Sequence, residues 1–515
     1  MKFICRKQRK KIQNRHKMYR FCVCILTFAM GYDNILLNSN HGGKDIMKRI
    51  TVRIERIEIF NFKNVKYGEL DFENNRKPYK ASILGLYGQN GSGKTALIDA
   101  LSLLKLTLSG QKVPVNFADY INVDSGYATL KYYFKVVNSE NNGEYSACYE
   151  FSIRKETDES AQNTEYANIN ELYKAVVFDE VLSYSYKDKE TKTKYLPVVD
   201  TRTEDVFIPK SKYSVLVGNN KKTKTNLLSD KKLTSSTSRS FVFSRELLNA
   251  LRKNCKEDYH LNLFESLIWF GNFELFIINT SNSGLITMNA LPLAFKYENK
   301  EKASIGSLMI NLNSSSLIPQ ETLDVVKNVV ENMNVVLTQL VPGLTISVKD
   351  LGTEMFPNGT IGSKIQLMSH KNSKEIPLQY ESEGIKKIIS ILQLLIVVYN
   401  KTSITVAVDE LDSGVFEYLL GELLRIISEK GKGQLIFTSH NLRPLETLDR
   451  GFVAFTTTNT NNRYIRMTNI KANNNLRDFY YRDIVLGEQN EPVYDPTNNY
   501  EIALAFREAG EFSGS

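Results

Sequence analysis

Eight consecutive residues in the first fifth of the chain have the types and spacing of a phosphate-binding loop. The stretch GQNGSGKT fits the pattern G-x-x-x-x-G-K-[ST] without a mismatch. Glycines let backbone N–H groups turn toward phosphate oxygens, and the helix that follows adds the positive end of its dipole. The lysine can reach the β- and γ-phosphates of ATP, and the threonine hydroxyl can ligate Mg²⁺. The expected nucleotide-binding residues are Gly88, Asn90, Gly91, Ser92, Gly93, Lys94 and Thr95.

A pair of carboxylates, Asp409-Glu410, follows the apolar run SITVAV much later in the chain. A carboxylate at the end of a buried strand is a Mg²⁺ partner in nucleotide hydrolysis, and Asp409 fits that role together with Thr95. Glu410 can polarise the attacking water as a general base. The pair could instead be an acidic N-cap of the next helix. The loop at Gly88 favours the catalytic interpretation.

The elements that must position these groups can be located around them. An apolar strand at 81–87 precedes the loop, and KTALIDALSLLKLTL after it has helical spacing. The carboxylate pair lies in a second alternation of helices and apolar strands. This alternation predicts an α/β fold with a largely parallel sheet covered on both faces. The ranges of that alternation are helix 386–400, strand 403–408, helix 414–428 and strand 434–439.

The remaining patterns predict antiparallel strands and a helical region. Residues 50–72 read as two strands around a turn at Tyr67-Gly68, and 127–154 as an antiparallel pair. A further strand is expected in 175–186. The polar, Lys-rich stretch 209–239 is interpreted as solvated loops, with a nucleic-acid arm as the alternative. Mostly helical patterns follow at 241–276 and 319–340, and no heptad repeat is long enough for a coiled coil.

The first 46 residues differ from the rest in charge. They hold ten Lys or Arg and two Asp, a net +8 of the total +9, so the remainder is about +1 (9 − 8). This segment has the outline of a signal peptide, but a clean strand pattern starts abruptly after Met47. We therefore expect the natural protein to start at Met47 and 1–46 to be a non-native or disordered extension. Two cysteines in the body, Cys148 and Cys255, suggest a reducing, cytoplasmic compartment.

The order of further motifs resembles the ABC-type ATPases, a family that includes SMC and Rad50 proteins. ESEGIKK (381–387) lies one helix before the carboxylate strand, and TSHN (438–441) lies one helix and one strand after it. The resemblance implies that Ser382 and Gly384 belong to a signature that meets ATP on a partner subunit. It also implies that Asp412 belongs to the D-loop and that His440 senses the γ-phosphate. By the same resemblance, Asn61-Phe62-Lys63 would touch the adenine, and no clear Q-loop glutamine can be placed.

Within that family the chain resembles the OLD-like group of prokaryotic ATPases (the AAA-15 and AAA-21 group). The stretches IPLQYESEGIKKIISIL, VDELDSGVFEYLL and FTSHNLRPLE carry this resemblance. OLD nucleases add a Toprim domain with a D-x-D set, yet the 75 residues after His440 (515 − 440) contain no D-x-D. The chain is therefore similar to stand-alone ATPases of anti-phage systems of the PARIS, AbiL and Septu types. Their companions are Toprim or HNH nucleases.

The resemblance implies an SMC- and Rad50-head-like ATPase that hydrolyses ATP with Mg²⁺ and senses infection, with a phage protein as a candidate trigger. It would work as a homodimer or higher homo-oligomer with composite ATP sites, would control a separately encoded effector, and would not bind a membrane. The alternative is a RecF- or SMC-like DNA-repair ATPase that clamps duplex DNA; DNA binding stays open. The expected parts after the extension are the N-terminal half of the head at 47–200, a helical insertion at 201–345, the C-terminal half at 346–470, and a cap or partner-docking segment at 471–515.

Overall fold

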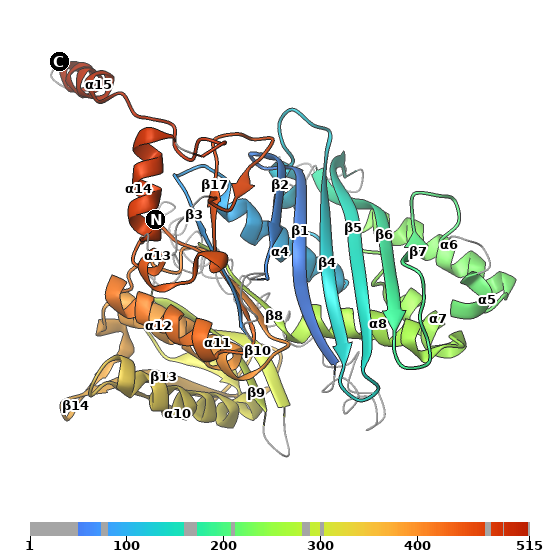
Figure 1. The fold of residues 1–515 in the computed structure, drawn as a ribbon. Coiled ribbons are helices and arrows are strands. Elements are labelled where there is room, and N and C mark those ends of the chain that lie inside the picture. The colour runs from blue at the N-terminus through green and yellow to red at the C-terminus, as the bar shows by residue number, and fades with distance from the viewer. Residues whose placement is uncertain are drawn as a thin grey trace, which may run out of the picture.

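The computed structural model describes residues 50–73, 81–158, 173–207, 212–280, 289–298, 303–468, 475–487 and 489–512. The predicted start at Met47 and the extension 1–46 lie outside the described residues. The described part is a mixed α/β fold in which no long coiled coil occurs, as the sequence predicts (Figure 1). No described helix is long and apolar enough to cross a membrane.

A six-stranded sheet, called the parallel sheet below, forms the middle layer in the order β18-β17-β3-β16-β15-β8. Its strands run parallel except for the edge pair β17–β18. All residues of β3, β15, β16 and β17 are buried, because other elements cover both faces. The predicted strands at 81–87, 403–408 and 434–439 are confirmed. The bounds are β3 (Ser82–Tyr87), β8 (Leu275–Ile278), β15 (Thr405–Val408), β16 (Gln434–Thr438), β17 (Val453–Thr456) and β18 (Tyr464–Ile465).

The second sheet is antiparallel and has the order β2-β1-β4-β5-β6-β7. The pair predicted at 127–154 and the strand predicted at 175–186 are confirmed. The first turn is not at Tyr67-Gly68, as the sequence suggested, but at residues 63 and 64. Gly68 lies inside a strand opposite Ile59, where its missing side chain makes room for the ring of Tyr464. The bounds are β1 (Ile50–Phe62), β2 (Val65–Asp71), β4 (Tyr127–Asn138), β5 (Gly143–Thr157), β6 (Tyr173–Lys187) and β7 (Leu196–Asp200).

Helices cover the parallel sheet on both faces and so create two hydrophobic cores. In the first core, α4 (Lys94–Leu108) lies between the two sheets and packs against α8 (Asp258–Phe273), which in turn contacts α7 (Arg245–Asn254) (Figure 1). In the second core, α10 (Leu323–Leu340), α11 (Glu383–Asn400) and α12 (Glu417–Lys430) cover the opposite face. The predicted helices at 319–340, 386–400 and 414–428 are confirmed within a few residues.

Buried polar bonds also join the two sheets directly. The side chain of Gln434, at the start of β16, accepts from the Ile54 N–H at 2.9 Å and donates to the Ile54 carbonyl at 2.8 Å. The Thr405 hydroxyl donates to the same Gln434 oxygen at 2.9 Å. The amide thus replaces a backbone partner for β1, which fixes how the antiparallel sheet sits over the parallel one.

The range 201–345, predicted as a helical insertion, also contributes a strand to the parallel sheet. Its strand β8 belongs to the parallel sheet beside β15, and α10, at its end, packs on β12 beyond residue 345. The Lys-rich stretch expected as solvated loops contains α5 (Lys212–Leu216) and α6 (Lys221–Ser236). The Asn220 side chain caps α6 by accepting from the Lys222 N–H, and Leu227 anchors it in the first core. Because α6 has few apolar residues, its sequence shows little hydrophobic periodicity, and this is why a helix was not predicted there.

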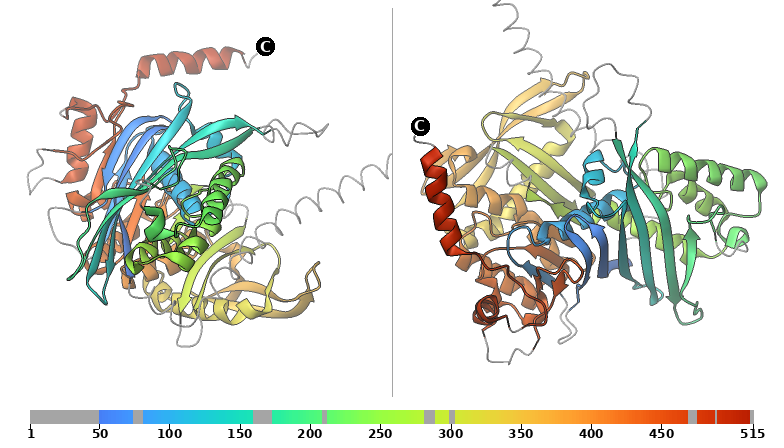
Figure 2. Two further views of the ribbon diagram at one scale, coloured as in Figure 1. Left: turned by 90° about the vertical axis from the view of Figure 1, so that its right-hand side faces the viewer. Right: turned by 90° about the horizontal axis from the view of Figure 1, so that it is seen from above.

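The remaining elements lie beside the second core and at the C-terminus. Two strands pair as β9–β10, and a small antiparallel sheet has the order β11-β13-β12 with β14 on β13. Their bounds are β9 (Ala290–Glu298), β10 (Ala303–Asn311), β11 (Ser316–Pro319), β12 (Thr345–Met355), β13 (Ile361–Lys371) and β14 (Lys374–Pro377). The last helices are α13 (Pro444–Thr447), α14 (Leu476–Leu486) and α15 (Asn499–Phe512). The further views show α15 extending from the body (Figure 2).

Candidate nucleotide-binding site

The predicted phosphate loop joins β3 to α4 and is wrapped around its own lysine. Gly88, Gly91 and Gly93 have φ angles of 152°, 75° and 97°, in the left-handed region that favours glycine. A Cβ on Gly88 would lie 1.7 Å from Thr456 Oγ1, so this position also needs glycine for space. The Nζ of Lys94 donates to the carbonyls of residues 88 and 89 at 2.8 Å each. The lysine is therefore held where phosphate oxygens would compete for it.

Residues far away in the chain hold this loop in shape, and most of them were not predicted from the sequence. The turn residue Asn64 donates to the Gly91 carbonyl. From β18, Tyr464 donates to the Gly93 carbonyl at 2.9 Å, and Arg463 donates to the Asn64 carbonyl at 2.7 Å. Of the three residues predicted to touch adenine, Lys63 forms an ion pair with Asp99 of α4. The β1–β2 turn thus packs directly against the loop.

The carboxylate pair lies at the carboxyl end of β15. Asp409 is 1% exposed, and its Oδ1 accepts from the Thr438 hydroxyl at 2.5 Å. The Thr438 oxygen in turn accepts from the Glu410 N–H at 2.8 Å, so one hydroxyl orients both acids. Glu410 has a φ of 50°, in the left-handed region. Such strain in a residue that is not glycine costs about 1 kcal/mol or more and is frequent at functional sites.

Electrostatics show that the loop and the carboxylates share one site. Burial lowers the pKa of Lys94, and three carboxylates oppose that shift. In decreasing order of effect they are Asp409, Glu410 and Asp412. Two predicted groups that are 315 positions apart (409 − 94) are thus brought together by the order of strands in the parallel sheet.

The site fits Mg²⁺ with a nucleotide triphosphate. The second oxygen of Asp409, Oδ2, is buried and has no hydrogen-bond partner among the described residues. A buried carboxylate oxygen without a partner is costly unless a cation or donor reaches it. Asp409 with the Thr95 hydroxyl would hold Mg²⁺, Lys94 would bind the phosphates, and the bound metal would neutralise charge that develops on them.

Hydrogen bonds join the side chain of the predicted D-loop residue Asp412 to the backbone at the predicted switch residue His440. Oδ2 of Asp412 accepts from the N–H groups of His440 and Asn441, at 3.1 and 2.9 Å. Oδ1 of Asp412 is buried without a partner among the described residues. The His440 side chain is exposed and stands at the end of β16, the strand between those of the loop and the carboxylates.

The predicted signature begins α11, on the opposite face of the parallel sheet from α4. Ser382 is the exposed N-cap of this helix, and its hydroxyl accepts from the Ile385 N–H at 3.4 Å. Gly384 lies against the loop that follows the D-loop, since a Cβ there would be 2.2 Å from the Gly414 carbonyl oxygen. Within one chain, therefore, the signature contacts the D-loop segment and not the phosphate loop.

One polar residue beside the carboxylates escaped the sequence analysis. β8 pairs with β15 in parallel register, with Ile278 opposite Val408, and the Asp409 N–H donates to the Ile278 carbonyl at 2.8 Å. The next residue, Asn279, consequently lies beside Asp409 at the edge of the sheet. Asn279 thus supplies a side-chain amide beside the carboxylates, whereas no Q-loop glutamine could be placed from the sequence. The sequence signal that could have located Asn279 is the apolar run LFII directly before it, which is typical of a buried strand.

Three features together define a P-loop ATPase of the ABC type. A glycine-rich loop follows a parallel strand, an Asp-Glu pair with a buried aspartate lies two strands away, and an antiparallel sheet covers the helix after the loop. Residues 83–446 match the family described as "AAA domain, putative AbiEii toxin, Type IV TA system". This match spans well over half of the chain, and the chain belongs to that family. A comparison with curated proteins finds no match.

Solved structures with similar folds include SMC head domains and the recombination mediator protein RecF. An SMC head bound to the C-terminal winged-helix domain of ScpA is 11% identical, with a TM-score of 0.37 and coverage of 80% of this chain and 98% of that chain. The SMC head domain from Thermotoga maritima is 14% identical, with a TM-score of 0.34 and coverage of 81% and 99%. The recombination mediator RecF with ATP is 14% identical, with a TM-score of 0.30 and coverage of 76% and 92%. The fold assignment rests on this chain's own strand order.

Proposed function

We propose that this chain is the ATP-hydrolysing sensor and regulator of a prokaryotic anti-phage, abortive-infection system. In this role it controls a separately encoded effector, a Toprim or HNH nuclease, in response to a trigger such as a phage protein. Two features support the proposal: the phosphate loop with the carboxylate pair Asp409-Glu410, and a C-terminal segment that contacts the phosphate loop. The resemblance of this chain to the OLD-like group motivates the choice of a nuclease as the effector.

Hydrolysis is assigned to groups at the end of β15. Glu410 would take a proton from the attacking water, with its backbone fixed by the Thr438 hydroxyl. His440 would approach the γ-phosphate from the end of β16. Lys94 would exchange its two loop carbonyls for phosphate oxygens, which are stronger acceptors because they are charged.

The composite site needs a second copy of the chain. Ser382 is exposed on the face opposite α4, so a signature can reach a phosphate loop across an interface between two heads. Large aromatic side chains stand exposed beside it: Tyr380 and Phe416 are each 70% exposed. Exposed aromatics gathered near a polar binding feature favour a protein interface. Two equivalent sites then require at least a dimer.

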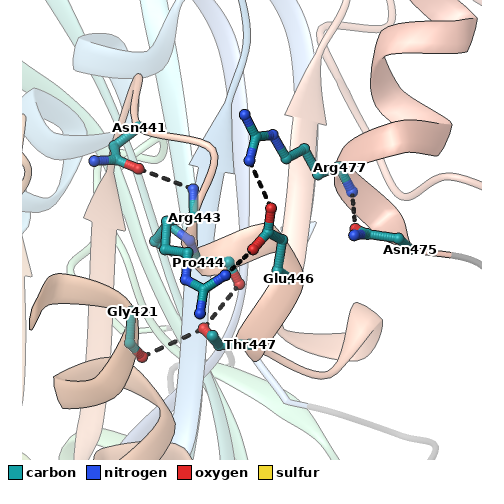
Figure 3. A network of polar contacts seen from close by, with 8 residues as sticks. All are labelled: Gly421, Asn441, Arg443, Pro444, Glu446, Thr447, Asn475 and Arg477. Carbon is teal, nitrogen blue, oxygen red and sulfur yellow. Dashed lines mark hydrogen bonds and ion pairs between the residues drawn. The ribbon is translucent and has the colours of Figure 1, made fainter. Parts of the chain in front are cut away.

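The observation that carries effector control is the path of the C-terminal segment, residues 475–512. Its Asp495 N–H donates to the side chain of Gln89, within the phosphate loop, at 2.8 Å. Arg477 of α14 donates to Glu446 of α13 at 2.6 Å. Arg443 pairs with the other oxygen of Glu446, and the Arg443 N–H donates to the side chain of Asn441, the residue after His440 (Figure 3).

That segment ends in a helix with an exposed surface. All residues of α15 from 499 to 510 are exposed, including Tyr500 at 78% and Phe506 at 77%. A helix with apolar side chains in solvent is suited to a groove on another protein. The C-terminal segment therefore offers a physical connection from the nucleotide loop to a docking helix.

The test is affinity purification from the native operon, with a tag placed before Met47 and mass spectrometry of the retained proteins. We expect a nuclease in fixed stoichiometry with the full chain. It should be lost from a variant lacking residues 499–512 that still hydrolyses ATP at the parental rate. Full-chain preparations without any effector would contradict the proposal.

The second candidate is a RecF- or SMC-like clamp on duplex DNA. Exposed lysines on α6, among them Lys221, Lys222 and Lys232, favour it as a basic stripe. Two other lysines of this helix are engaged within the protein, because Lys224 pairs with Asp205 and Lys231 donates to a carbonyl. Duplex binding that weakens with salt and strengthens with ATP would select this candidate.

A further inference from the structure

One arginine outside the predicted motifs is buried beside the phosphate loop. Arg463 directly precedes β18 and is 4% exposed. Its guanidinium donates to the Thr457 carbonyl at 2.6 Å and to the Asn64 carbonyl at 2.7 Å, and its Nε is buried without a hydrogen-bond partner among the described residues. Both acceptors are neutral backbone groups, and within the described part of the chain Arg463 has no ion pair. Buried charges are normally paired, so this cation stands out.

Arg463 contacts the phosphate loop at one glycine and supports it at another. Its aliphatic stem lies against the loop, because a Cβ built on Gly93 would be 3.4 Å from Arg463 Cδ. Its guanidinium also holds the β1–β2 turn at Asn64, whose side chain donates to the Gly91 carbonyl. The arginine therefore reaches Gly93 directly and Gly91 through one intermediate residue.

The direction of one peptide group places this charge relative to a bound phosphate. Tyr464 donates to the Gly93 carbonyl at 2.9 Å, and in a trans peptide the N–H of the next residue points the opposite way. The N–H of Lys94 therefore points away from the β17–β18 hairpin, toward the side where phosphates would bind. Burial lowers the pKa of Arg463, and Tyr464 and Asp495 oppose this shift, but a guanidinium stays charged at neutral pH. A buried charge is little screened, so it makes the phosphate side of the loop more positive.

We propose that Arg463 is a positioning residue for the nucleotide, which braces the phosphate loop from the hairpin side and adds a buried positive charge to it. The phosphates of a bound nucleotide would supply the negative charge that Arg463 lacks as an ion-pair partner among the described residues. None of the motif residues predicted from the sequence has this role. The inference rests on nucleotide binding at this loop, which the proposed function also requires.

The test compares Arg463→Gln with Arg463→Lys, because both side chains can donate a hydrogen bond to a carbonyl but only lysine keeps the charge. Arg466→Gln is the matched control. Arg466 lies three residues later and also donates to backbone carbonyls, those of Asp71 at 2.7 Å and Val453 at 3.2 Å. Neither of these residues belongs to the phosphate loop or to the β1–β2 turn.

The first readout is equilibrium binding of a fluorescent ATP analogue, which needs no turnover. For Arg463→Gln we expect binding to weaken at least about tenfold, because a poorly screened charge is lost beside the phosphates. Arg463→Lys and Arg466→Gln should bind within about threefold of the parent.

The second readout is steady-state ATP hydrolysis. In Arg463→Gln, KM for ATP should rise with the loss of binding, while kcat at saturating ATP changes less than about threefold. The reason is that Thr438, outside the hairpin, orients Asp409 and Glu410. Thermal unfolding checks that the variants fold, and Arg463→Met replaces the glutamine variant if that one does not.

Parental ATP binding in Arg463→Gln would overturn the inference, as would equal weakening in Arg463→Lys or in Arg466→Gln. Each of these results leaves the proposed function standing, because the parent chain still binds ATP. A parent chain that binds no ATP would overturn both.

Discussion

A single methyl group at Gly384 should separate the signature helix from the D-loop segment. A Cβ there would lie 2.2 Å from the Gly414 carbonyl oxygen, whereas ordinary van der Waals contact begins at 3.4 Å. The two backbones must therefore move apart by about 1.2 Å (3.4 − 2.2). Overpacking of this kind costs about 1–3 kcal/mol. The better helix propensity of alanine returns at most about 1 kcal/mol, so Gly384→Ala should lower the free energy of unfolding by up to about 3 kcal/mol.

The functional effect should exceed the effect on stability, because displacement of this contact misplaces Ser382 and the D-loop together. We expect kcat for ATP to fall at least about tenfold, since shifts near 1 Å can cost about a hundredfold. Binding of a fluorescent ATP analogue should stay within about threefold of the parent, because Lys94 is not displaced. Gly126→Ala is the control, since a Cβ there meets nothing within 4 Å. If both variants have the same unfolding curve and the same kcat, the contact has no role.

Three further predictions follow from the site and its supports. Glu410→Gln should reduce kcat by about a hundredfold or more while ATP binding and a closed dimer persist, measured by phosphate release and size-exclusion chromatography; turnover at the parental rate would remove Glu410 from the base role. Thr438→Val should lower kcat by at least about tenfold, because the valine cannot hydrogen-bond Asp409 or the Glu410 N–H, and Thr438→Ser should retain activity. Burial lowers the pKa of His260 to about 4, with a smaller contribution from Lys212, against an ordinary value of 6.5. Between these values the unfolded chain binds a proton that the folded chain does not, so the free energy of unfolding should fall by up to about 3 kcal/mol as the pH drops from 6.5 to 4. His260→Gln should flatten this part of the profile in urea titrations at several pH values, and an unchanged slope would refute the assignment.

The parts of the site that the sequence predicts are those whose signal is local. The loop at Gly88 and the acids after β15 are each written in fewer than ten consecutive residues, with an apolar strand beside them. Hydrophobic periodicity likewise located β3, α11 and β16, because each buries a regular face. The mixed α/β architecture followed from their alternation.

The parts that the sequence does not predict depend on register and on contacts between distant segments. Nothing near Asn279 indicates that β8 pairs with β15, because pairing is set by the whole sheet. The turn was assigned to Gly68 on its glycine, yet that glycine is required by the ring of Tyr464, nearly 400 positions later. The hydrogen bond between Asp495 and Gln89 joins two loops without any periodic pattern. Local propensity carries no information about such partners.

The proposed control of an effector requires that ATP binding change a contact made by the C-terminal segment. A ligand shifts an equilibrium between two states only by the difference in its affinities for them. The phosphate loop supplies such a difference. Without phosphates, Lys94 bonds to the carbonyls of Gly88 and Gln89, and the side chain of Gln89 accepts from Asp495. Bound phosphates would draw Lys94 away and leave the Gln89 carbonyl without its charged donor. Gln89 is also the residue whose side chain holds the segment leading to α15. The nucleotide state would thus be transmitted through Gln89, a loop residue whose type the phosphate-loop pattern leaves free. Replacing Gln89 with alanine should therefore spare ATP binding and uncouple it from whatever α15 engages.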